Sequence, residues 1–99
     1  MGKRENEVET YLNDQIIARG GFTRKITYEG RRGAADRFCF LPNGKLYIIE
    51  VKTSNGTEST LQRRERERLI GMGYTALCLY GKEQINELME VYDYARQTE

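Results

Sequence analysis

Residues 36–52 read DRFCFLPNGKLYIIEVK, and this stretch decides the fold. Two runs rich in aromatic and β-branched residues, 36–41 and 45–52, flank the turn-forming sequence Pro42-Asn43-Gly44. Apolar runs on both sides of an Asn-Gly turn predict a β-hairpin.

The second run ends in Glu50-Val51-Lys52. Side chains alternate along a strand, so Glu50 and Lys52 project from one face while Val51 points away. The pairing register decides whether Asp36 joins them. If the numbers of paired residues add up to 86, Asp36 lies opposite Glu50, whereas a sum of 87 turns it away. An even sum requires a loop with an odd number of residues, such as 42–44, and we predict the even sum.

Two carboxylates at cross-strand distance repel one another unless a positive charge lies between them. A hard divalent cation with oxygen ligands, Mg²⁺ or Mn²⁺, fits this arrangement without any imidazole. Lys52 would then stand beside the cation, where it could position a water or stabilise charge on a phosphate. An edge strand that ends in solvated charges is the simpler alternative.

The composition narrows the chemistry further. The 99 residues leave room for one domain, 1–99, with 38% hydrophobic and 31% charged residues, as in a compact, highly charged protein. There is no histidine, which excludes Ser-His-Asp triads, Cys-His nucleophile pairs and His-ligated zinc. Cys39 and Cys78 each lie in an apolar stretch and are expected to be buried core thiols.

No apolar run approaches the roughly 20 residues that span a bilayer, and no apolar signal segment follows Met1. We therefore expect no membrane partner and a cytoplasmic location, in a bacterial or phage-infected host cell.

The whole chain is predicted to form one α/β unit. Helices are expected over 4–19, from a cap at residue 57 or 59 to about 72, and around 85–95; strands are expected over 22–28, 36–41, 45–52 and 75–80. The order is αβββαβα. The third strand, the second helix and the last strand form a β-α-β unit, so those two strands should be parallel in a small mixed sheet flanked by helices.

An Asp followed by Glu-x-Lys on a hairpin resembles the PD-(D/E)xK nuclease superfamily, which has a restriction-endonuclease-like core. More of the chain, about residues 5–90, resembles its VRR-NUC (virus-type replication-repair nuclease) branch. The matching segments are ENEVE at 5–9, GRRGAADR at 30–37, EVK at 50–52, Leu61-Gln62, and Leu69 through Gly73-Tyr74. The family usually has Pro before the Asp, where this chain has Ala35. Proline supplies no ligand, so we expect slightly loosened geometry and intact chemistry.

The resemblance implies a role for each matching residue. Asp36 and Glu50 correspond to the metal-binding acids, the Val51 carbonyl to a backbone ligand, and Lys52 to the catalytic lysine. A first-helix glutamate completes the acidic set; Glu7 is preferred from the family alignment and Glu9 is the second choice. Gln62 corresponds to the family's glutamine on the following helix.

Two of these assignments have simpler explanations. Ser59-x-x-Gln62 is also a capping box, which could be the entire role of Gln62. Glu5, Glu7 and Glu9 lie in the first turn, where acids also suit the positive end of the helix dipole.

Basic residues adjoin the predicted site. Arg31 and Arg32 directly precede Asp36 in a glycine-flanked loop and, with Arg24 and Lys25, are expected to contact phosphates. Four arginines of the second helix alternate with glutamates, which is typical of a solvated, salt-bridged face. No aromatic pattern indicates base stacking, so we expect shape and backbone to be recognised.

The resemblance thus implies a Mg²⁺- or Mn²⁺-dependent endonuclease acting on branched or structured DNA, with four-way (Holliday) junctions as the expected substrate. Two symmetric cuts are best made by a homodimer, which the last helix could form through Leu88, Met89, Val91 and Tyr92. The alternatives are a non-cleaving DNA-binding module of the same fold and a sequence-specific restriction-type nuclease. For the latter, 99 residues leave little room for a base-reading element.

Overall fold

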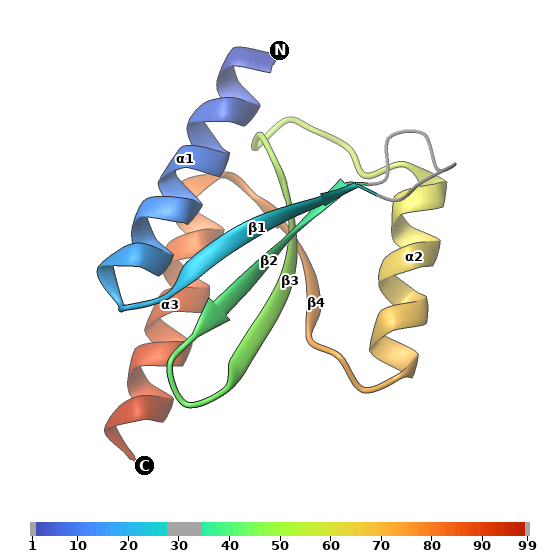
Figure 1. Cartoon of the computed structure of the whole chain (residues 1–99). Helices are drawn as coiled ribbons and strands as arrows, with labels where there is room; N and C mark the ends of the chain where they lie inside the picture. Colours follow the sequence, from blue (N-terminus) through green and yellow to red (C-terminus); the bar gives the residue numbers. More distant parts are fainter. Residues whose placement is uncertain (1, 28–34, 99) are drawn as a thin grey trace.

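The computed structural model describes residues 2–27 and 35–98, and within them the element order αβββαβα is confirmed (Figure 1). The elements are α1 (Gly2–Ala18), β1 (Phe22–Thr27), β2 (Ala35–Leu41), β3 (Lys45–Lys52), α2 (Thr60–Gly71), β4 (Ala76–Tyr80) and α3 (Gly81–Gln97). The last residue of the predicted first strand and the loop that follows it lie outside the described residues.

The four strands form a mixed sheet in the order β1-β2-β3-β4. The β1–β2 and β2–β3 pairs are antiparallel, and β3 and β4 are parallel. Helix α2 provides the crossover between the two parallel strands, as the β-α-β pattern predicts.

The predicted register of the β2–β3 hairpin is confirmed. Phe38 pairs with Ile48 and Leu41 with Lys45, so paired residue numbers add up to 86 and the loop holds three residues, 42–44. Asn43 and Gly44 both adopt positive φ, 67° and 71°. Asn and Gly tolerate this left-handed conformation better than other residues, so the local sequence stabilises a loop of this length.

Helices α1 and α3 lie side by side on one face of the sheet, and α2 lies on the other (Figure 1). The Arg19 guanidinium donates two 2.8 Å hydrogen bonds to the Asp93 carboxylate and so links α1 to α3. The main core lies between these helices and the sheet; its central side chains are Leu12, Ile16, Cys39, Ile49, Ile85 and Met89. Among the described residues, no helix is long and apolar enough to cross a membrane.

The two faces of the sheet differ because side chains alternate. Cys39 and Ile49 point toward α1 and α3 and are fully buried in the core, which confirms the expectation for the Cys39 thiol. The opposite face, on the side of α2, carries Asp36, Phe38 and Glu50. The hairpin register therefore assigns the candidate acids to the α2 side.

Most of the apolar residues predicted to form an interface on the last helix belong to the chain's own core. Met89 and Tyr92 are buried, and Leu88 packs against the same cluster. The expectation was wrong for Met89 and Tyr92, because helical spacing does not tell an outward stripe from the stripe that faces the sheet. Val91 and Tyr94 remain exposed, by 63% and 69%.

Gly21, between α1 and β1, lies directly against the backbone of β2 and a side chain of α1. A Cβ atom there would lie 2.2 Å from the Phe40 carbonyl oxygen and 2.9 Å from the Ile16 Cγ2 atom. We expect Gly21→Ala to lower the free energy of unfolding by about 1–3 kcal/mol, because backbone must move. Urea denaturation measures this change. Gly71→Ala is the matched control, since its Cβ would meet nothing within 4 Å. Equal losses in the two variants would contradict the steric explanation.

Candidate active site

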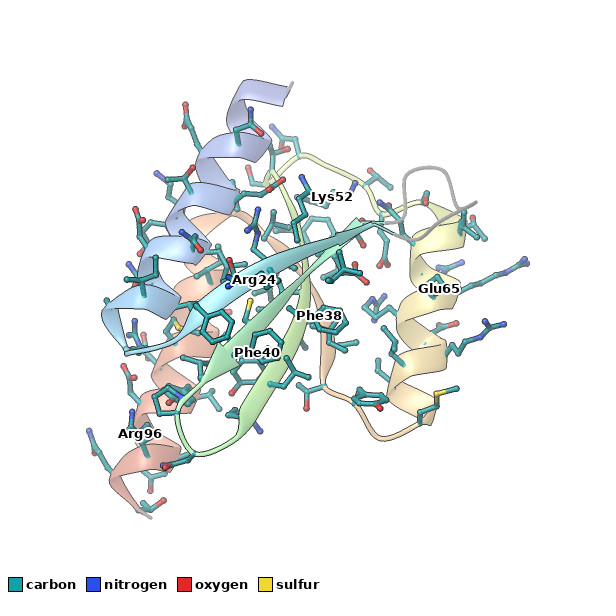
Figure 2. All side chains as sticks on the ribbon, viewed as in Figure 1. Arg24, Phe38, Phe40, Lys52, Glu65 and Arg96 are labelled. Carbon is teal, nitrogen blue, oxygen red and sulfur yellow. The ribbon has the colours of Figure 1, made fainter. Side chains whose placement is uncertain are left out.

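Asp36 on β2 and Glu50 and Lys52 on β3 lie on the α2 side of the sheet. Figure 2 shows Lys52 near the end of β3. Asp36 and Glu50 line one small cavity between the sheet and α2, together with Arg66. The Lys52 Nζ atom lies 3.6 Å from the Glu50 Oε2 atom. Three of the residues predicted for the site are therefore neighbours.

Glu50 is the most unusual of these residues because it is a buried carboxyl group. It is only 7% exposed, and among the described residues its Oε2 atom has no hydrogen-bond partner, with the Lys52 ammonium 3.6 Å away as its counter-charge. Burial raises the pKa of Glu50 to about 7; the nearby Lys52 charge lowers it, and the Asp36 and Glu58 charges raise it. A buried carboxylate oxygen without a hydrogen bond is costly unless a cation compensates it.

Glu58 is a site residue that the sequence analysis missed. It lies in the loop after β3, and its carboxylate accepts hydrogen bonds of 2.8 and 3.0 Å from the Arg66 guanidinium on α2. This bidentate pair lowers the pKa of Glu58. Burial and pairing thus push the pKa values of two adjacent carboxyl groups apart, an arrangement that is typical of functional sites.

Cys78 completes this cluster from β4. It pairs with Glu50 in the parallel register, and one ligand atom each from Glu50, Glu58 and Cys78 lie within 4.8 Å of one another. In the part of the chain that the structure describes, this is the single group of three such side chains. Cys78 is only partly buried, unlike the predicted core thiol, and burial raises the pKa of its thiol.

The donor chemistry fits a hard divalent cation. Asp36 and Glu50 offer carboxylate oxygens at one cavity, and Glu58 offers a third beside Glu50. The buried Oε2 atom of Glu50 makes no hydrogen bond within the described residues and has the Lys52 ammonium 3.6 Å away, so it has room in its bonding for a further positive partner. Oxygen donors of this kind suit Mg²⁺ or Mn²⁺, whereas the neutral Cys78 thiol adds little to such a site.

The turn after β3 fixes the base of Lys52. The Gly56 backbone N–H donates a 2.9 Å hydrogen bond to the Thr53 carbonyl oxygen. A Cβ atom on Gly56 would lie 3.1 Å from the Lys52 Cβ atom. The turn therefore passes close to the base of the Lys52 side chain, and a larger residue than glycine at position 56 would crowd it.

Glu7 and Glu9 belong to α1, which packs against the other face of the sheet. Glu7 is exposed and lines a surface groove with Tyr11 and Lys82. Glu9 forms ion pairs of 2.8 Å with Arg37 and 3.4 Å with Lys25. Neither glutamate belongs to the described three-residue cluster at Glu50, so a metal-binding role for Glu7 stays a prediction.

Gln62 forms the predicted capping box at the start of α2. The Ser59 backbone N–H donates to the Gln62 Oε1 atom at 2.9 Å, and the Gln62 backbone N–H donates to the Ser59 Oγ atom at 3.1 Å. The capping role is therefore confirmed. Val51, the predicted backbone ligand, has its side chain buried in the core.

The basic residues predicted to contact phosphate separate between the two faces. Arg24 pairs with Phe38 across β1 and β2 and so shares the face of Asp36, whereas Lys25 pairs with Arg37 on the α1 side. Arg31 and Arg32 lie outside the described residues. On α2, Arg66 binds Glu58 and Arg68 lies 3.8 Å from Glu65, which agrees with a largely salt-bridged helix.

The raised pKa of Glu50 predicts how stability depends on pH. The unfolded chain releases this proton near pH 4.5, and the folded chain near pH 7. The folded state therefore binds more protons in this interval, and its stability falls as the pH rises. We expect Glu50→Gln to gain up to roughly 3 kcal/mol relative to the wild type between pH 4 and pH 8, from the size of this shift. Urea denaturation of both proteins at several pH values measures the difference, and a constant difference would contradict it.

Similarity to known proteins identifies the family of this chain. No model of a known protein family matches the sequence. A phage protein described as "Putative nuclease p44", from Acyrthosiphon pisum secondary endosymbiont phage 1, is 36% identical over 76 residues, which cover 77% of this chain and 82% of that protein. A solved structure titled "VRR_NUC domain" aligns with a TM-score of 0.82 and 36% identity, covering 90% of this chain and 97% of the other. The chain belongs to the VRR-NUC family of nuclease domains.

Proposed function

We propose that this nuclease domain hydrolyses phosphodiester bonds in DNA with Mg²⁺ or Mn²⁺ at the site of Asp36, Glu50 and Lys52. The observation that carries the proposal is the buried Glu50 carboxyl, whose Oε2 atom makes no hydrogen bond within the described residues, on the same cavity as Asp36. The Lys52 ammonium offsets part of the cost of this buried negative charge, and a divalent cation shared with Asp36 would offset more of it.

Asp36, Glu50 and the Val51 carbonyl are proposed to hold the cation. Glu7, which lies on α1 at the other face of the sheet, is proposed as the fourth contributor and would have to approach the site for that role. A divalent cation supplies charge neutralisation at the phosphate and a more acidic water. The Lys52 ammonium, 3.6 Å from Glu50, is placed to orient the attacking water or to stabilise charge on the phosphate. Glu58 acts as a positioning residue, because its ion pair with Arg66 fixes a negative charge beside Glu50.

We further propose that the domain acts as a homodimer on branched DNA, with four-way junctions cut best. A small domain with one site has little surface for recognising a junction, and a two-fold pair presents two sites at once. Exposed Val91 on α3 supports an interface on that helix.

The direct test uses labelled linear duplex, flap and four-way junction DNA with Mg²⁺, Mn²⁺ or EDTA. Cleavage with either cation and none with EDTA is the expected result. DNA binding without cleavage under every condition would instead favour a non-cleaving DNA-binding module.

Lys52→Met should lower the cleavage rate at least 100-fold while DNA affinity stays within about threefold, because the ammonium acts mainly on the transition state. Lys45→Met, at the exposed start of the same strand, is the matched control and should cleave like the wild type. Single-turnover rates and fluorescence anisotropy separate the two effects. Unchanged cleavage by Lys52→Met would remove the lysine from the proposed site.

The assembly proposal predicts that Val91→Asp shifts the protein from dimer to monomer in light scattering. This variant should lose the preference for junctions over linear duplex, because two sites no longer act together. Met72→Asp, an equally exposed apolar position at the end of α2, should change neither property. A wild-type monomer that cuts both substrates equally well would contradict the dimer and leave the nuclease activity standing.

A further inference from the structure

Three phenylalanines gather on the open part of the sheet beside the candidate site. Phe22 and Phe40 pair directly across β1 and β2, with ring centroids 5.0 Å apart and planes inclined by 27°. The Phe38 ring lies 6.3 Å from the Phe40 ring. The Arg24 guanidinium carbon lies 4.7 Å from the centre of the Phe22 ring. We call Phe22, Arg24, Phe38 and Phe40 the aromatic platform.

The aromatic platform shares its sheet face with the candidate acids. Asp36, Phe38 and Phe40 are every second residue of β2, so their side chains project from the same face. Figure 2 shows Phe38 and Phe40 on β2 and Arg24 on β1, with Lys52 near the end of β3. At about 3.4 Å per strand residue, Phe38 stands roughly 7 Å from Asp36 and Phe40 roughly 14 Å.

These rings are accessible although they are strongly apolar. Phe22 is 48% exposed, and Phe38 and Phe40 are partly exposed. Helix α2 packs against β4, at the other edge of the sheet from β1. Water therefore reaches three adjacent aromatic rings, and a ligand with a flat apolar face would release that water.

We propose that the aromatic platform stacks unpaired nucleotides of the DNA strand that passes through the active site. This inference rests on the proposed function and specifies its substrate class: DNA with unpaired nucleotides within one to three positions of the cut, either in a flap or where bases open at the crossover of a junction. Bases in a duplex are already stacked on their neighbours, so only splayed, flapped or gapped nucleotides can lay a face on a phenylalanine.

The charges favour nucleic acid over a second copy of the chain as the occupant. A nucleotide offers a π face to the rings and a phosphate to the Arg24 guanidinium, so it satisfies both chemistries at once. A protein surface would have to bury this cation in the middle of an aromatic contact. Continuity with the acids at Asp36 also means that a strand held for cleavage would cross the platform.

The linear sequence shows no stacking pattern, which is why no base stacking was expected from it. Phe22 lies far from Phe38 and Phe40 in sequence, and the β1–β2 register brings the three together.

Binding measurements in EDTA test the platform without cleavage. We expect Phe22→Leu to bind a single-stranded or flapped oligonucleotide about five- to 100-fold more weakly than the wild type, the range expected for one lost stack. Duplex affinity should change less than threefold. Tyr94→Leu replaces an exposed aromatic residue on α3 and is the matched control for both substrates. Phe40→Leu provides a second variant, and circular dichroism checks the fold of each.

Abasic oligonucleotides locate the contact. Removing one base beside the scissile bond should weaken wild-type binding and have little further effect in Phe22→Leu, because the same stack is already lost. Unchanged single-strand affinity in both phenylalanine variants would overturn the platform. A wild-type dimer that Phe22→Leu converts to a monomer would assign the surface to a second copy and also overturn it. Wild-type cleavage with Mg²⁺ or Mn²⁺ is scored separately, so the two failures can be told apart, and a failed platform leaves the nuclease proposal standing.

Discussion

The register of the β2–β3 hairpin is the constraint on which the rest of the molecule depends. With paired numbers adding up to 86, Asp36 and Glu50 share the face toward α2, while Cys39 and Ile49 fill the core against α1 and α3. A slip by one residue would exchange the two sets, burying charge in the core and exposing apolar side chains to water. The loop 42–44 therefore determines both the core and the site.

The second constraint is the cost of burying the Glu50 carboxyl. It lies near the end of an apolar strand, where little water reaches it. The Lys52 charge favours its ionised form, and the Asp36 and Glu58 charges oppose it. Lys52 offsets part of the cost, and the Arg66 guanidinium keeps Glu58 ionised beside it. The positive and negative charges of the site thus come from β3, the loop after it and α2. A divalent cation would change the electrostatic potential there more than any single side chain does.

The element order, the parallel β3–β4 pair and the hairpin register could be predicted from the sequence because they follow from local signals. Turn residues, strand alternation and a β-α-β order each act over a few residues or a single crossover. Glu58 and Cys78 could not be predicted, since they reach Glu50 only through the folded path of the loop after β3 and through β4. The aromatic platform likewise depends on the pairing of strands that are distant in sequence. Which stripe of α3 is buried depends on the helix face that packs against the sheet.

Helix α2 differs from the other two helices in having no buried residue. Leu69 and Arg66 approach the cavity beside the sheet, and the bond from Arg66 to Glu58 ties the helix to the preceding loop. Little apolar surface therefore opposes a local separation of this helix from β4, compared with the packing of α1 and α3. In amide hydrogen exchange, α2 should lose protection well before the hairpin does. Of the three helices, the one that lies over Asp36 and Glu50 is thus held by the least buried apolar surface, so a bulky polymer could displace it without unfolding the core.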